Sequence, residues 1–127
     1  MISLSLEAHK LYCMTPEDII NLLDAECICG EQNLHRPIRH AFAADLMSDV
    51  LRLNTEDMLL ITGMANLQVI RTAEMSDIPF ILFVRGKCVT EEMKKLADEN
   101  GIMILSCRQS MFRVCGELYK AGLPPVY

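Results

Sequence analysis

The chain has 127 residues and a formal net charge of −5, from 17 acidic and 12 basic side chains. Apolar residues make up 51% of it, which excludes a disordered chain and supplies the core of one domain over residues 1–127. The acidic balance argues against nucleic-acid binding, which needs a clustered basic face. No window approaches the roughly 18 consecutive apolar residues of a membrane helix, and the start lacks the basic region of an export signal. We therefore expect a cytoplasmic protein without membrane contact.

The N-terminal half has mixed signals. Its first residues alternate apolar side chains with serines, which predicts an edge strand or an extension within residues 1–14. A helix is predicted after Thr15, because Thr is a good N-cap and the following Pro and acidic residues suit a first turn. Residues 25–29 and 38–43 are predicted as short strands. Asp45 is interpreted as the cap of a short helix.

The C-terminal half alternates three apolar runs with helical patterns. The runs begin near residues 58, 79 and 102, and each is followed by apolar side chains at helical spacing. Unbroken runs of this kind are typical of parallel strands covered on both faces. We therefore predict an α/β fold of three layers, α/β/α, around a mainly parallel, mixed sheet.

Two blocks of the sequence resemble a known family. Residues 45–51, Asp-Leu-Met-Ser-Asp-Val-Leu, are similar to an acidic-leucine-serine-acidic segment of the DRTGG domain. Residues 60–74 are similar to the strand, Thr-Gly turn and helix of that family, and the resemblance extends over residues 15–123. It implies the fold of the N-terminal domain of bacterial HPr kinase/phosphatase, of which this chain would be a stand-alone relative. It also implies frequent homodimers and a regulatory role without catalysis.

The motif that names the family is altered. Residues 35–41, His-Arg-Pro-Ile-Arg-His-Ala, stand where the family has Asp-Arg, a Thr and a glycine pair, so that Arg36 and Ile38 are what remains of it. The missing glycines remove a place where a ligand could approach the backbone closely. Arg36 stays a candidate ligand-binding residue, and the alternative is an exposed loop.

The turn of residues 62–66 is the first candidate for a ligand site. It follows a buried strand and precedes a helix, where open α/β sheets bind ligands. The N–H groups at the start of the helix, with the side chains of Thr62 and Asn66, could hold a phosphate or carboxylate. Gly63 would let that anion approach. The alternative is an ordinary turn in which Asn66 caps the helix.

Four further polar residues are candidates for the same site. Arg85 and Lys87 follow the next buried strand and could add positive charge, or they are solvated turn residues. Asp45 and Ser48 lie in the first family-like block. Carboxylates can work as acid and base, but no His or nucleophile is placed to join Asp45, and there is no P-loop sequence. No catalytic residue is predicted.

The six cysteines are expected to be reduced thiols. Cys27 and Cys29 form the one closely spaced pair and would share a face of their strand. The other four offer no second pair, and zinc sites normally need one. We predict no metal and no cofactor.

Two functions follow from these observations. The first is a non-catalytic regulatory or interaction module of the DRTGG type, a homodimer that binds a small anionic ligand such as a nucleotide. The alternative is an accessory or assembly subunit of a redox, hydrogenase-like complex, which would contact a larger enzyme and bind no small molecule.

Overall fold

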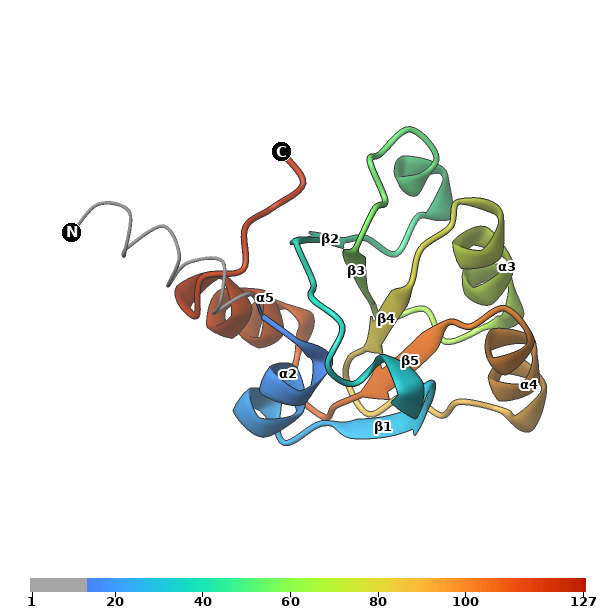
Figure 1. Ribbon diagram of the computed structural model, residues 1–127, viewed down its shortest axis with the longest axis horizontal. Coiled ribbons are helices and arrows are strands. Elements are labelled where there is room, and N and C mark those ends of the chain that lie inside the picture. Colours follow the sequence, from blue (N-terminus) through green and yellow to red (C-terminus); the bar gives the residue numbers. More distant parts are fainter. Residues whose placement is uncertain (1–13) are drawn as a thin grey trace.

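The computed structural model describes residues 14–127 and contains the strands predicted from the sequence (Figure 1). Five strands form one sheet in the order β1-β5-β4-β3-β2. Neighbours from β2 to β5 are parallel, and β1 pairs antiparallel with β5. The strands are β1 (Glu26–Cys29), β2 (His40–Ala43), β3 (Met58–Thr62), β4 (Phe80–Phe83) and β5 (Met103–Ser106). The predicted strand within residues 1–14 lies, except for Met14, outside the described residues.

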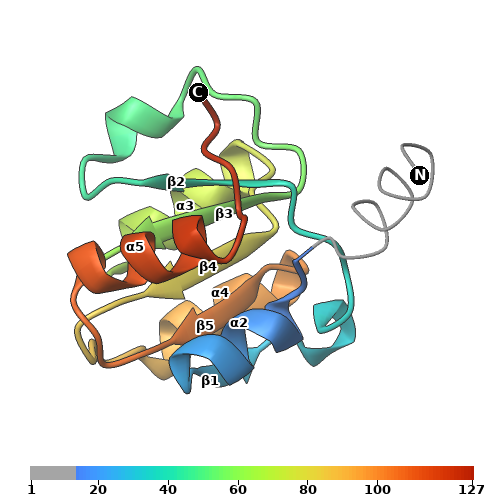
Figure 2. The ribbon, with the colours of Figure 1, turned by 90° about the vertical axis from the view of Figure 1, so that its left-hand side faces the viewer.

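Helices cover both faces of this sheet. Among residues 14–127, the α-helices are α2 (Pro16–Leu23), α3 (Leu67–Met75), α4 (Glu91–Glu99) and α5 (Met111–Lys120), and two short 3₁₀ helices are η1 (Glu31–Asn33) and η2 (Met47–Val50). α3 and α4 pack on one face, and α2 and α5 pack on the other (Figure 2). None of the helices in residues 14–127 is long and apolar enough to cross a bilayer.

The strands carry apolar side chains on both sides, which is why the sheet has two cores. In β3, Met58 and Leu60 pack with α3 and α4, whereas Leu59 and Ile61 pack with α2 and α5. All four side chains are at most 2% exposed. The predicted three-layer α/β/α fold with a mainly parallel, mixed sheet is therefore confirmed.

Each α-helix begins at a polar side chain that satisfies its first turn. The side chains of Thr15, Asn66, Thr90 and Ser110 each accept a hydrogen bond from the backbone N–H three residues further on. Such bonds replace the partners that the first N–H groups of a helix lack. These local contacts explain why a helix start such as that after Thr15 could be placed from the sequence.

Asp45 does not cap the short helix that follows it, so that prediction was wrong. η2 has Leu46 at its N-cap position and no side-chain cap bond. The carboxylate of Asp45 accepts hydrogen bonds from Thr62 and Gly63 at the end of β3, 17 and 18 residues away. Two donors from another strand hold it more firmly than one local N–H would.

The last residues of the chain extend the sheet beyond β2. The backbone N–H of Ala41 donates to the carbonyl oxygen of Pro124 at 3.0 Å, and the N–H of Val126 donates to that of Ala41 at 3.2 Å. This pairing protects the edge of the sheet. The same segment and α5 border an open apolar groove of about 520 Å³.

Candidate ligand-binding site

Four of the predicted site residues meet at the carboxyl edge of the sheet. Asp45 follows β2, Thr62 ends β3 and is followed by Gly63, and Arg85 follows β4. β2, β3 and β4 are parallel neighbours, so their carboxyl ends lie at one edge. The topology therefore gathers side chains that are far apart in the sequence.

A hydrogen-bonded network joins these residues. One carboxylate oxygen of Asp45 accepts from the hydroxyl of Thr62 at 3.1 Å and from the N–H of Gly63 at 2.8 Å. The hydroxyl of Thr62, which is fully buried, accepts in turn from the N–H of Met64 at 3.1 Å. The turn after β3 thus already holds an anion, and that anion is the protein's own carboxylate.

The network changes the interpretation of two residues that were predicted to bind a ligand. Asn66 accepts a hydrogen bond from the N–H of Val69 at 3.1 Å, so it is the helix cap that was the alternative interpretation. A Cβ atom at Gly63 would collide with the guanidinium of Arg85. The absence of a side chain at Gly63 therefore makes room for Arg85.

Arg85 is the cation of this network. Its φ of 66° lies in the left-handed region, which costs a residue other than glycine about 1 kcal/mol. Its backbone N–H donates to the carbonyl of Gln109 at 2.9 Å and fixes the loop. The guanidinium donates to the carbonyl of Gly63 at 3.5 Å and lies 4.0 Å from the carboxylate of Asp45, with the side chain 49% exposed. Both distances are long, so the charge of Arg85 is only loosely neutralised.

The structure places Arg36 at the opposite edge. Its guanidinium lies 3.1 Å from the carboxylate of Asp57 and 5.3 Å from the ring centre of Phe80. Asp57 precedes β3 and Phe80 opens β4, so both mark the amino ends of the strands. Arg36 does not join the Asp45–Arg85 network. Ser48 lies exposed in η2, and among the described residues its side chain makes no hydrogen bond to the network.

Comparison with known families shows the family to which the chain belongs. A family model described as the DRTGG domain matches residues 18–121. The chain belongs to the DRTGG domain family. The resemblance seen in the sequence is confirmed, although the naming motif is altered. No curated protein matches the chain.

A solved structure shares the fold of this DRTGG domain. It contains the CBS and DRTGG domains of the regulatory region of Clostridium perfringens pyrophosphatase, complexed with the activator diadenosine tetraphosphate. The TM-score is 0.67 at 19% sequence identity, over 86% of this chain and 47% of that chain. The present chain thus spans about half the length of that structure.

The DRTGG domain has a second group of polar residues that the sequence-based prediction largely missed. Lys87 lines a cavity of about 810 Å³ at the ends of β4 and β5, together with Arg108. Arg108 follows a buried strand, the same signal that selected Arg85 and Lys87, so the sequence could have indicated it. Asp24 and Glu26 also line this cavity. Their place there depends on the antiparallel pairing of β1, which the sequence does not show.

Cys27 and Cys29 of the DRTGG domain lie on opposite faces of β1, so the predicted shared face was wrong. The register of β1 against β5 shifts between them, as in a β-bulge, which breaks the alternation of side chains. Cys27 packs with α2 and α5, and Cys29 packs with α3 and α4. Burial raises the pKa of Cys29 to about 11 and raises that of Cys27, which disfavours the thiolate that a metal binds. In residues 14–127 no three metal-ligating side chains gather.

Proposed function

We propose that this DRTGG domain is a non-catalytic regulatory module that binds a small anionic ligand, such as a nucleotide, at the carboxyl edge of its sheet. The observation that carries the proposal is the loosely paired guanidinium of Arg85 beside the turn after β3. The pyrophosphatase regulatory region with the same fold, crystallised with a nucleotide activator, supports it. Neither comparison links the chain with a redox complex.

The network suggests how binding could be transmitted. A guanidinium has five N–H donors, and within residues 14–127 that of Arg85 makes one hydrogen bond. A phosphate or carboxylate of a ligand would form shorter, charge-assisted bonds with it than Asp45 does at 4.0 Å. Asp45 would keep its two bonds to Thr62 and Gly63. Arg85 would then leave the carbonyl of Gly63, and the turn that begins α3 would change.

The same contacts favour binding over catalysis. The carboxylate of Asp45 is the natural candidate for a general base at this edge. One of its oxygens accepts two hydrogen bonds at the end of β3, and the other faces the guanidinium of Arg85 at 4.0 Å, so the carboxylate is held in a structural network. A module of this kind would act by changing shape for a partner rather than by transforming its ligand.

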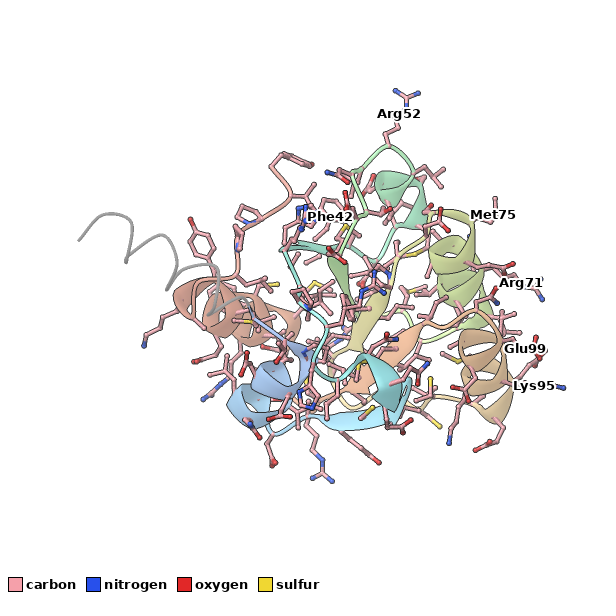
Figure 3. All side chains as sticks on the ribbon, viewed as in Figure 1. Phe42, Arg52, Arg71, Met75, Lys95 and Glu99 are labelled. Carbon is pink, nitrogen blue, oxygen red and sulfur yellow. The ribbon has the colours of Figure 1, made fainter. Side chains whose placement is uncertain are left out.

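Removal of the Arg85 guanidinium tests this function. Arg85→Ala is expected to weaken ligand binding about tenfold to a hundredfold, since a hydrogen bond to a charged group contributes roughly 1.5–3 kcal/mol. Calorimetry against nucleotides and phosphorylated metabolites measures the affinity. Arg71→Ala is the matched control, because Arg71 lies exposed on the outer side of α3 (Figure 3). Unchanged binding by Arg85→Ala, or no binding of any compound by the unmodified chain, would contradict the proposal.

We also propose that the module is a homodimer formed through the outer face of α5. Phe112 and Tyr119 on this face are 90% and 71% exposed, and Gly116 between them lets a second helix come close. Arg113 and Glu117 lie beside them. In an antiparallel pair of α5 helices around a twofold axis, Arg113 of each copy would face Glu117 of the other. The outer face of α5 is thus apolar, and its charges would pair with those of the same face in a second copy.

Phe112→Ser is expected to weaken this dimer about a hundredfold or more, because both copies lose the burial of an aromatic ring, worth roughly 1.5–3 kcal/mol each. Sedimentation over a concentration series gives the dissociation constant. Met75→Ser removes another highly exposed apolar side chain, from α3, and should leave the constant unchanged (Figure 3). A monomeric unmodified chain would refute the dimer, and an equal effect of both substitutions would refute the α5 interface.

A further inference from the structure

The loops after β4 and β5 leave the sheet toward opposite faces. The loop after β4 leads to α4 in the core with α3, whereas the loop after β5 leads to α5 in the core with α2 (Figure 2). Open α/β sheets bind ligands in the crevice that opens at the carboxyl ends of two such strands. The loops after β3 and β4 both lead to the face of α3 and α4. The ends of β4 and β5 therefore form a separate crevice, at the same carboxyl edge as the Arg85 network.

A polar cavity of about 810 Å³ lies at that place. Backbone hydrogen bonds fix its walls: the N–H of Gly86 donates to the carbonyl of Cys107 at 2.9 Å. The side-chain amide of Gln109 donates to the carbonyl of Leu23 at 2.7 Å and ties the β5 loop to the end of α2. Its lining residues are Leu23, Asp24, Glu26, Gly86, Lys87, Ser106, Cys107, Arg108 and Gln109. We call this cavity the β4–β5 crevice.

The β4–β5 crevice contains unpaired charges of both signs. Lys87 comes from the loop after β4, and Arg108 comes from the loop after β5. Asp24 follows α2, and Glu26 begins β1. Among residues 14–127, none of these four side chains has an opposite charge within 4.0 Å. Charges that share a cavity without neutralising one another can contact a ligand that has both anionic and donor groups.

We propose that the β4–β5 crevice binds a nucleoside phosphate. Lys87 and Arg108 would hold the phosphate, which favours paired cationic donors from two loops. Asp24 and Glu26 would accept hydrogen bonds from the ribose hydroxyls, the usual role of carboxylates at such crevices. The proposal rests on the proposed function, because Arg85 begins the loop that carries Lys87. A ligand in the crevice would thus contact the loop whose first residue, Arg85, faces Asp45 and Gly63.

Binding of AMP, adenosine and inorganic phosphate by the full chain tests the assignment. Calorimetry should show AMP bound by the unmodified chain, with adenosine and inorganic phosphate each at least tenfold weaker. Lys87→Ala and Arg108→Ala should each weaken AMP binding about tenfold, whereas Lys95→Ala on the exposed side of α4 should not (Figure 3). All three side chains are exposed, so circular dichroism should show an unchanged fold.

Asp24→Asn tests the contact with the ribose separately from the contact with the phosphate. Asn tolerates the left-handed φ of 52° at this position, so the backbone is preserved while the charge is lost. AMP binding should fall severalfold, and inorganic phosphate binding should not fall. Failure of AMP to bind, or AMP binding that Lys87→Ala and Arg108→Ala leave unchanged, would overturn the crevice assignment. The proposed function is judged separately, by Arg85→Ala and the wider set of ligands.

Discussion

Gly30→Ala is expected to destabilise the domain by about 3 kcal/mol or more, the sum of a left-handed backbone and a steric overlap. Gly30 follows β1 with a φ of 86°. An added Cβ would lie 2.6 Å from the Cα of Met103 and 3.2 Å from the carbonyl oxygen of Ile102. These are backbone atoms of the segment that forms β5, so they can move away only if the β1–β5 pairing is disturbed. Urea unfolding measures the loss.

Gly101→Ala is the matched control for this substitution. Gly101 has a similar left-handed φ of 67°, but an added Cβ would meet nothing within 4 Å. Only the left-handed backbone then disfavours alanine, and the expected loss of unfolding free energy is about 1 kcal/mol. Equal losses of unfolding free energy at the two glycines would show that the close approach of Gly30 to β5 does not contribute to the cost of Gly30→Ala.

Asp57→Ala is expected to lower the free energy of unfolding by about 2 kcal/mol, from lost charged hydrogen bonds and a left-handed alanine. The Asp57 side chain is 15% exposed, and its two oxygens lie 3.1 Å from Arg36 and 3.2 Å from Arg39. Its φ is 54°. The substitution would leave both guanidinium groups without this carboxylate. Urea unfolding at low and high salt measures the effect, which salt should reduce.

Asp57→Asn is the control that separates the two causes. Asn tolerates the left-handed backbone and keeps one acceptor oxygen, so its expected cost is about 1 kcal/mol, with little salt dependence. If Asp57→Ala and Asp57→Asn were equally costly and equally sensitive to salt, charge alone would explain the effect. A cost of Asp57→Ala within about 0.5 kcal/mol of zero would contradict the structural role of this residue.

This contact gives Arg36 a physical role in the altered family motif. Arg36 bridges Asp57 and the ring of Phe80, and Arg39 reaches the same carboxylate. The backbone N–H of Arg39 also donates to the carbonyl of Asp57 at 2.9 Å. The motif segment thus ties the start of β3 to the start of β4. We interpret the motif segment in this chain as a structural element that links these two strands at the amino edge of the sheet.

The errors made from the sequence share one cause. Asp45 was interpreted through its nearest neighbours, but its hydrogen-bond donors come from the end of β3. Cys27 and Cys29 were placed on one face by regular alternation, but a shift in the pairing with β5 turns them apart. In both cases the deciding partner belongs to another strand. Patterns within one segment cannot show such a partner.

The sequence by itself determined the helix start at Thr15, the buried strands and the family. A cap such as Thr15 acts on an N–H three residues away, and an apolar run needs only its own side chains to be recognised. Only the tertiary structure decided that α5 lies on the opposite face from α4, which opens the β4–β5 crevice. It also decided that Arg85 meets Asp45 and that Arg36 does not. Those results depend on strand order and pairing, which are set by contacts between distant segments.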